Sequence, residues 1–209
     1  MPTGLRRFHQ TNHLHFITFS CYKRQPFLHS EEAKDTLQQI LEQTRKQQGL
    51  RIAAYVLMPE HVHLLANEPA TGTLATFIQI LKQLTSRKLN SPEQKQLWQR
   101  RYYDFNVSSP EKLIEKRQYI RNPVTRGLVS KPEDYPWSSF NHHTIGEPHP
   151  VEIESQWTAR AANSKSSISQ PSISPKSRCP ILRAFCEGWD VRGPSAQLSP
   201  AQINKGSSL

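Results

Sequence analysis

The sequence predicts an α+β fold of the ferredoxin-like type, with a βαββαβ core, an antiparallel sheet and one additional C-terminal helix. Runs rich in β-branched and aromatic residues alternate with amphipathic helical segments in this order. Pro59 separates two consecutive apolar runs, which favours a hairpin over one long strand. In such a sandwich the two core helices cover one face of the sheet, and we expect the other face to be free for a ligand.

The core begins with one strand and one helix. Residues 13–22, HLHFITFSCY, have the β-branched and aromatic content of a strand. A helix is predicted over 29–49 because Ser30 is a favourable N-cap and Gly49 a favourable C-terminal residue. This helix carries apolar residues at helical spacing, so one of its faces is expected to pack on the sheet.

The remaining core elements follow in the order that the fold requires. Strands are predicted over 50–58 and 60–67, on either side of Pro59. The segment 71–90 has an apolar stripe with helical period and is predicted as the second helix. Residues 100–107, RRYYDFNV, are predicted as the fourth strand.

The additional helix is predicted over 108–122. Ser109 is a suitable N-cap, and Pro110 occupies the first helical position, where its missing N–H is not needed. We expect Pro123 to end this helix, because proline disfavours the helical conformation of the residue before it.

The chain divides into a folded domain over 1–160 and a tail over 161–209. The tail contains 11 serines and 5 prolines and has no sustained hydrophobic periodicity. Such a composition cannot bury enough apolar surface to order the chain, so we expect the tail to be mostly disordered.

The charge balance favours a polyanionic partner. The chain has 27 Lys and Arg against 17 Asp and Glu, for a net charge of +10. Residues 79–131 contain twelve of the basic side chains and four of the acidic ones. This concentration is typical of a nucleic-acid-binding face, with a plain solvated surface or an anionic membrane surface as alternatives.

Localisation follows from what the sequence lacks. No apolar stretch reaches the ~20 residues of a membrane-spanning helix, and the first residues lack the apolar core of a signal peptide. The three cysteines form neither a CxxC pair nor an even framework. We therefore expect a cytoplasmic, nucleoid-associated protein.

Two histidines in the segment MPEHVHLL, residues 58–65, are candidate metal ligands. Side chains alternate along a strand, so His61 and His63 project from one face with Cα atoms roughly 6–7 Å apart, while Val62 faces the core. Two imidazoles at this spacing can bind one metal ion. Glu60 is expected on the opposite face, so a third ligand must come from elsewhere in the chain.

Other histidine pairs need no metal. His13 and His15 have the same spacing and are interpreted as ordinary strand residues. His142 and His143 are adjacent in a segment that we expect to be a polar loop, where they cannot share a strand face. A plain surface position is the alternative for His61 and His63 as well.

Tyr119 is predicted to lie off the apolar stripe of the last helix. At ~100° per residue, Leu113 and Ile120 share one side, whereas Tyr119 falls among charged positions. A tyrosine in such a position can pack on the domain surface, or it can be the nucleophile that attacks a phosphodiester. Asn122 lies three residues later on nearly the same side, and its amide oxygen could bind a hard metal ion.

These features occur together in a known family. The chain resembles the REP-associated tyrosine transposases, which belong with small insertion-sequence transposases to the HUH single-strand nucleases that use one tyrosine. The resemblance extends from about Arg6 to about Arg160. It rests on six ordered blocks: FITFSCYKRQPFL, YVLMPEHVHLL, FIQILKQLTSRKLN, LWQRRYYDFNV, KLIEKRQYIRNPVTRGLV and YPWSSF.

The resemblance implies a metal-dependent endonuclease and strand transferase that acts on single-stranded DNA at hairpin-forming repeats. His61 and His63 match the family's pair of ligands for Mg or Mn. Tyr119 matches the nucleophile that becomes joined to the 5′ phosphate, and Asn122 matches the residue that completes the metal shell. The freed 3′-hydroxyl can reverse the reaction, so cleavage and joining need no external energy source.

The spacing of the last two residues departs from the family pattern. The family usually places four steps between the tyrosine and the asparagine, whereas three steps separate Tyr119 from Asn122. On an α-helix this change turns Asn122 by ~100°. We therefore expect either that the helix unwinds ahead of Pro123 or that the third ligand is displaced.

The expected partner is single-stranded or hairpin DNA, bound by a monomer or homodimer without a membrane surface. Tyr102 and Tyr103 are competing candidates for the nucleophile. A catalytically impaired hairpin-binding protein on the same fold is the main alternative, and an unrelated metal-dependent hydrolase is a third. The basic and aromatic side chains expected to contact DNA are Lys82, Arg87, Lys88, Trp98, Arg100, Arg101, Lys116 and Arg121.

Overall fold

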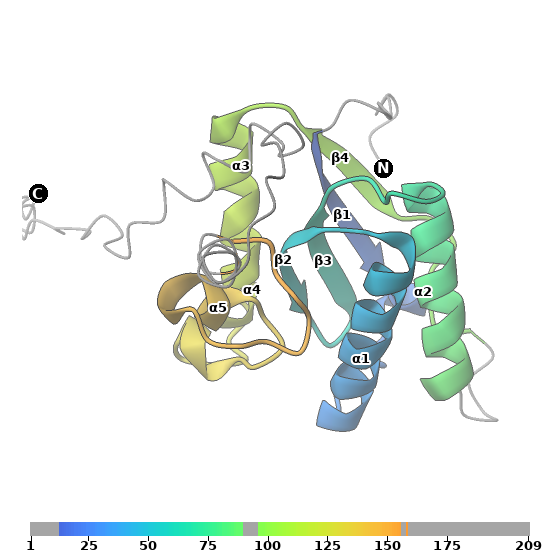
Figure 1. Ribbon diagram of the computed structural model, residues 1–209. Coiled ribbons are helices and arrows are strands. Elements are labelled where there is room, and N and C mark those ends of the chain that lie inside the picture. Colours follow the sequence, from blue (N-terminus) through green and yellow to red (C-terminus); the bar gives the residue numbers. More distant parts are fainter. Residues whose placement is uncertain (1–12, 90–95, 156–157, 159–209) are drawn as a thin grey trace, which may run out of the picture.

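The computed structural model describes residues 13–89, 96–155 and 158. Its sheet has the strand order β2-β3-β1-β4 with every neighbouring pair antiparallel, which is the ferredoxin-like arrangement that the sequence predicts (Figure 1). The core elements are β1 (Leu14–Ser20), α1 (Glu31–Gln48), β2 (Ile52–Leu57), β3 (His61–Ala66), α2 (Leu74–Leu89) and β4 (Tyr103–Val107).

Helix α1 begins and ends where its capping residues predict. The Ser30 hydroxyl accepts a hydrogen bond from the backbone N–H of Ala33 at 3.2 Å. Gly49 adopts a left-handed conformation with φ of 62° after the last turn. A Cβ atom at Gly49 would lie 2.8 Å from Cβ of Ala70, so both the backbone conformation and the space favour glycine.

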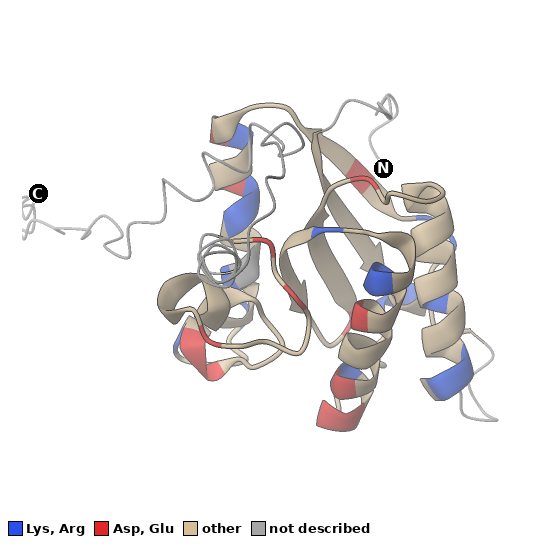
Figure 2. Ribbon diagram, in the orientation of Figure 1, with Lys and Arg blue, Asp and Glu red and all other residues tan. Residues whose placement is uncertain are grey.

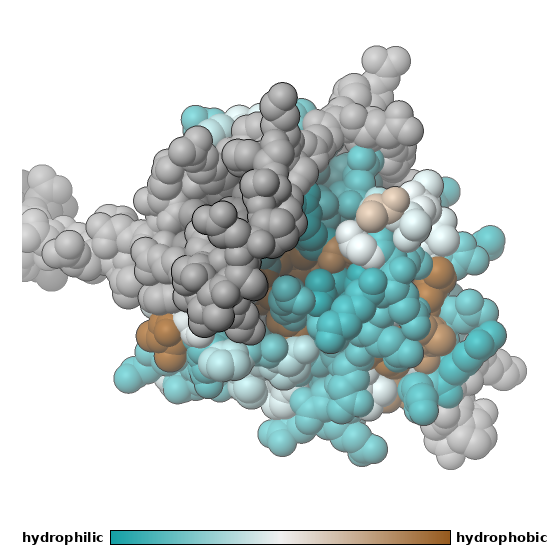
Figure 3. Space-filling model, in the orientation of Figure 1, coloured by the Kyte–Doolittle hydropathy of each residue, from teal (hydrophilic) through white to brown (hydrophobic). Residues whose placement is uncertain are grey.

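The larger hydrophobic core lies between the sheet and helices α1 and α2. Ile17 and Phe19 of β1 and Val62 and Leu64 of β3 point to this side, where they pack with Phe77 of α2. Val62 therefore faces the core, as the strand alternation predicts. Outside this core, the face of the molecule that carries α1 is covered largely by hydrophilic side chains (Figure 3).

The expectation that the second face of the sheet is free is wrong. Helices α3 (Pro110–Arg117) and α5 (Phe140–Ile145) lie on the side opposite α1 and α2 (Figure 1). Leu113 of α3 and Phe140 of α5 pack there against Phe16 of β1. The physical reason is the apolar character of β2 and β3, whose residues are buried at every position and so require cover on both faces.

The chain after α3 continues in helical turns and does not stop at Pro123. A 3₁₀ turn, η2 (Gln118–Arg121), leads directly into the short helix α4 (Asn122–Thr125). Pro123 lies in the first turn of α4, where the missing N–H is not needed. Two further 3₁₀ turns are η1 (Tyr22–Arg24) and η3 (Pro132–Asp134).

His142 and His143 do not lie in a polar loop, as the sequence suggested, but are buried in α5. Nε2 of His143 lies 2.9 Å from the carbonyl oxygen of Ala53 in β2, to which it donates. Nε2 of His142 lies 2.7 Å from the hydroxyl of Ser155. Because α5 covers the second face of the sheet, residues that look polar in sequence become part of the core.

The predicted tail over 161–209 and the domain boundary at residue 160 lie outside the described residues. In the part of the chain that the structure describes, none of the helices combines the length and the hydropathy needed to cross a bilayer.

The buried His143 should make the stability of the protein depend on pH. Burial lowers the pKa of His143 from 6.5 to about 3, so below pH 6.5 the unfolded chain binds a proton that the folded chain rejects. Folding stability should therefore fall as the pH falls from 6.5 toward 3, by about 1 kcal/mol per pH unit for this residue. In His143→Gln, which keeps a donor for Ala53, urea unfolding at pH 6 and pH 5 should show a correspondingly smaller loss. An unchanged slope would contradict this assignment.

Candidate metal centre

Strand pairing places His61 and His63 together on the face of the sheet that carries α3. In the antiparallel register of β1 and β3, His63 lies opposite Thr18, and His61 lies opposite Ser20. Both imidazoles are buried, with 4% and 7% of their surfaces exposed. Their Nε2 atoms converge to 2.9 Å. The two side chains therefore share one small site, as the HxH spacing predicts.

The outer nitrogen of each imidazole lies beside a polar group, which forms a hydrogen bond with His63 but only an ion-pair contact with His61. Nδ1 of His63 lies 2.8 Å from the hydroxyl of Thr18, and Nδ1 of His61 lies 3.2 Å from a carboxylate oxygen of Glu60. The same oxygen of Glu60 lies 2.9 Å from the guanidinium of Arg126. The expectation that Glu60 points to the opposite face is wrong, because Glu60 lies in the turn before β3, where strand alternation does not apply.

This arrangement favours the metal-binding form of both rings. Nδ1 of His63 can donate its proton to the Thr18 hydroxyl, and the Glu60 carboxylate near His61 favours a proton on Nδ1 of that ring. With both protons on Nδ1, the lone pairs of both Nε2 atoms face one another. Burial lowers the pKa of His61, although the neighbouring Glu60 opposes this effect. Burial and the neighbouring His61 lower the pKa of His63 to about 3. Both imidazoles are therefore neutral near pH 7.

Asn122 lies at the open side of the histidine pair. Its side-chain nitrogen Nδ2 is 3.4 Å from Nε2 of both His61 and His63. A half-turn of the amide would present Oδ1 at the same position, where it could act as a third ligand. Among the described residues, no group of three His, Cys, Asp or Glu side chains could hold a metal ion, so this site relies on two imidazoles and an amide.

The residues fit an octahedral divalent ion. Neighbouring ligands of such an ion, at bond lengths of about 2.1 Å, lie about 3 Å apart. The 2.9 Å between the two Nε2 atoms matches this edge. Two neutral imidazoles and one amide oxygen leave coordination positions for water or for phosphoryl oxygens.

The 3₁₀ turn η2 compensates for the short spacing between Tyr119 and Asn122. The backbone N–H of Asn122 donates to the carbonyl oxygen of Tyr119, which closes an i to i+3 turn. A 3₁₀-helix has about three residues per turn, so residues three apart lie on the same side. The ring of Tyr119 is 5.0 Å from that of His63 and 4.8 Å from that of Phe16. The displacement expected for an α-helix is therefore not found.

The two competing candidates for the nucleophile, Tyr102 and Tyr103, lie farther from the histidine pair than Tyr119 does. Tyr103 shares the face of His63 but belongs to β4, with β1 between the two residues. Tyr102 points to the opposite face of the sheet, where the ammonium group of Lys82 lies 6.0 Å from its ring. Tyr119 remains 38% exposed beside the histidine pair, so its hydroxyl is the best candidate for a nucleophile.

Five of the eight side chains predicted to contact DNA form two groups on opposite faces of the sheet, and Figure 2 shows basic positions along both α3 and α2. Lys116 and Arg121 belong to the segment around Tyr119, and the Lys116 ammonium group is 5.6 Å from the Tyr119 ring. Lys82, Trp98 and Arg100 line a groove beside α2. The remaining three, Arg87, Lys88 and Arg101, are exposed.

His13 and His15 interact with the neighbouring strand β4. Nδ1 of His15 lies 2.8 Å from the carboxylate of Asp104, and Nδ1 of His13 lies 2.9 Å from the side-chain oxygen of Asn106. His15 is buried on the α1 and α2 side, away from His61 and His63. The chain's two HxH pairs therefore have different environments.

Sequence reasoning missed Thr18, Glu60, Phe16 and Arg126. Thr18 and Phe16 lie on one face of a strand, but only the register with β3 reveals that this face carries His63. Arg126 follows α4, and its contact with Glu60 joins segments more than sixty residues apart. No local pattern in the sequence indicates such a contact.

Comparison with known proteins gives three consistent findings. The family model described as "Transposase IS200 like" matches residues 9–123. A Haemophilus influenzae protein assigned as a REP-associated tyrosine transposase is 31% identical over 121 residues, which cover 52% of this chain and 69% of that protein. The REP-associated tyrosine transposase of Escherichia coli is 23% identical over 150 residues, which cover 70% of this chain and 88% of the relative.

A solved structure of a REP-associated tyrosine transposase bound to a REP hairpin has the same fold. It superposes with a TM-score of 0.60 at 19% identity, covering 73% of this chain and 92% of the other.

The hydrogen bond between Thr18 and His63 can be tested by stability. Thr18→Val keeps the shape of the side chain but leaves a buried imidazole nitrogen without its partner. We expect the free energy of unfolding in urea to fall by about 1–2 kcal/mol. Thr18→Ser, which keeps the hydroxyl, should lose less. Equal stability of Thr18→Val and the wild type would show that this contact does not hold the ring.

Proposed function

The chain belongs to the family of IS200-like transposases, with REP-associated tyrosine transposases among its relatives, and from this premise we propose that it cuts and joins single-stranded DNA at hairpin-forming repeats through Tyr119. The observation that carries the proposal is the assembly of Tyr119, His61, His63 and Asn122 at one site from β3 and the segment after α3. These residues are the ones that match the family's nucleophile and metal ligands.

The reaction begins with attack of the Tyr119 hydroxyl oxygen on the phosphorus of a phosphodiester. The new bond joins Tyr119 to the 5′ phosphate, and the bond from phosphorus to the 3′ oxygen breaks. The 3′ oxygen leaves as a hydroxyl and takes up the proton that the phenol loses, directly or through solvent. Because one phosphodiester is replaced by another, attack by a 3′-hydroxyl reverses the step and joins strands.

Several side chains of this site can support that step. Phe16 and His63 pack against the ring of Tyr119 and hold the phenol beside the imidazole pair. The Lys116 ammonium group lies 5.6 Å from the same ring and forms an ion pair with Glu115 at 2.5 Å, so a phosphate at Tyr119 would compete with that carboxylate for the cation. His61, His63 and Asn122 would hold Mg²⁺ or Mn²⁺, which supplies charge stabilisation to the phosphoryl oxygens when bound.

The partner follows from the relatives and the charge. One relative of the same fold is described in complex with a REP hairpin. This chain carries a net charge of +10, and basic side chains lie near Tyr119 and along α2. We propose hairpin DNA with a single-stranded flank as the substrate.

A hairpin-binding protein without catalytic activity is the second candidate. The shortened spacing between Tyr119 and Asn122 motivates it, because a displaced third ligand would weaken a metal site. The 3₁₀ turn and the 3.4 Å approach of the Asn122 amide to both imidazoles argue for the active enzyme instead.

Covalent adduct formation distinguishes the two candidates. The protein is mixed with a labelled hairpin that has single-stranded flanks, in the presence of Mg²⁺ or Mn²⁺, and adducts are resolved on a denaturing gel. We expect an adduct with the wild type and none with Tyr119→Phe. His61→Ala should slow cleavage at least about 100-fold, because charge stabilisation of several kcal/mol is lost.

Tyr102→Phe and Tyr103→Phe are the matched controls and should retain the adduct. Salt-sensitive binding of the hairpin without any adduct, at every metal concentration, would refute strand transfer and favour the binding protein. A collapse of DNA binding in His61→Ala that equals the loss of cleavage would assign the imidazoles a structural role.

A further inference from the structure

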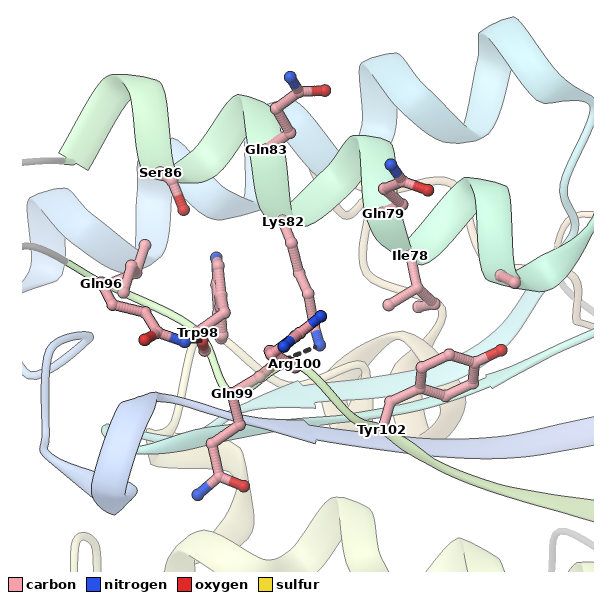
Figure 4. A pocket seen from close by; sticks show the side chains of 12 residues that line it. Ile78, Gln79, Lys82, Gln83, Ser86, Gln96, Trp98, Gln99, Arg100 and Tyr102 are labelled. Atoms are coloured by element: carbon pink, nitrogen blue, oxygen red, sulfur yellow. Dashed lines mark hydrogen bonds between the residues drawn. The ribbon is translucent and has the colours of Figure 1, made fainter.

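A groove of about 600 Å³ lies between α2 and the segment 96–102, on the face of the sheet opposite Tyr119 (Figure 4). One side is formed by α2, including the buried Ile78 and the half-buried Lys82, and the other by Trp98, Arg100 and Tyr102. Its volume falls within the range of small-molecule sites in proteins. Nothing in the reaction at Tyr119 uses this groove.

The groove contains two cations and no acidic side chain in its lining. Lys82 reaches from α2 across the groove and donates to the carbonyl oxygen of Gln99 at 2.9 Å (Figure 4). Among the described residues, no carboxylate forms an ion pair with Lys82, and burial lowers its pKa to about 8. A half-buried cation without a carboxylate partner favours an anionic ligand. Arg100 adds a second positive charge at the same groove.

The groove also offers a planar apolar wall. The ring of Tyr102 lines it and packs beside the larger hydrophobic core, and Ile78 adds an aliphatic surface. Trp98 is 5% exposed, and its indole N–H has no hydrogen-bond partner among the described residues. In Figure 4 this nitrogen points toward α2, between Ser86 and Lys82. An aromatic face, an unused donor and two cations form the combination that binds a base with its phosphate.

The groove and the histidine pair lie at the same end of the sheet. The backbone N–H of Gln99 donates to the carbonyl oxygen of Ser20 at 2.9 Å, and Ser20 lies opposite His61 in the pairing of β1 and β3. Two interstrand steps, about 10 Å, therefore separate the backbones of Gln99 and His61. The segment 96–102 leads into the edge strand β4, so a DNA strand can pass from one face to the other around that edge.

We propose that this groove is a second DNA subsite, which holds an unpaired nucleotide of the flank with its base against Tyr102 and its phosphate between Lys82 and Arg100. This inference rests on the proposed function, because it assumes that the chain binds single-stranded DNA. The subsite lies on the face of the sheet away from the nucleophile. Binding of the flank there would not depend on the metal ion.

The test compares two DNAs with one set of variants. Binding is measured by fluorescence anisotropy, without divalent metal, for a hairpin with single-stranded flanks and for the same hairpin without them. Lys82→Gln and Tyr102→Leu should each weaken binding of the flanked hairpin about tenfold, the size of one lost stacking or phosphate contact, and should change binding of the bare hairpin less than about twofold.

Conservative and distant variants control for folding and for net charge. Lys82→Arg and Tyr102→Phe keep the cation and the ring and should bind the flanked hairpin like the wild type. Lys46→Gln removes one charge from the exposed face of α1 and should have little effect on either DNA.

Two results would overturn the subsite: unchanged binding of the flanked hairpin by Lys82→Gln and Tyr102→Leu, or equal losses for both DNAs. If the wild type binds neither DNA, the proposed function itself fails and the subsite with it. If the wild type binds both DNAs but Lys82→Gln and Tyr102→Leu give either of those two results, the subsite is refuted and the proposed function is not. Cross-linking of 5-bromouracil in the flank to the peptide spanning 96–102 gives an independent readout of position.

Discussion

The i to i+3 hydrogen bond from the Asn122 N–H to the Tyr119 carbonyl is the interaction on which the candidate site depends. It closes a turn of about three residues, so that two side chains three positions apart point to one side. In an α-helix the same sequence would turn Asn122 away from Tyr119 by ~100° relative to a four-residue spacing. The tighter turn allows the amide of Asn122 to approach both imidazoles at 3.4 Å while the Tyr119 ring packs beside His63.

That turn is held against the sheet by contacts made at both ends. Before it, Leu113 packs on the second face of the sheet, and after it the guanidinium of Arg126 pairs with Glu60. Glu60 also contacts His61, so one carboxylate connects the strand of the histidine pair to the segment that carries Tyr119 and Asn122. The pairing of β1 with β3 completes the site, because it places Thr18 beside the other imidazole. Burial keeps both rings neutral, which is the form in which imidazole binds metal.

The sequence was sufficient for the core and for the shared strand face of His61 and His63. Alternation along a strand places His61 and His63 on one face, and Ser30, Ser109 and Gly49 mark helix ends through their own chemistry. Contacts between distant segments were not accessible in the same way. Glu60 lies in a turn, where strand alternation does not predict which way a side chain points. The second face of the sheet is covered by α3 and α5, whose packing on the sheet is not visible in the local sequence. The sequence alone could not predict the 3₁₀ turn, because local spacing does not decide between an α-helix and a 3₁₀-helix. The turn packs on Phe16 and His63 through Tyr119, which is a contact between distant segments.

A crystal structure of the protein grown with Mn²⁺ tests the central claim most directly. We predict one Mn²⁺ ion bound by Nε2 of His61, Nε2 of His63 and Oδ1 of Asn122, with residues 118–121 in the 3₁₀ turn and the Tyr119 hydroxyl facing the ion. Asn122 turned away from an ion that only the imidazoles hold, or an α-helical segment in place of the turn, would contradict the account.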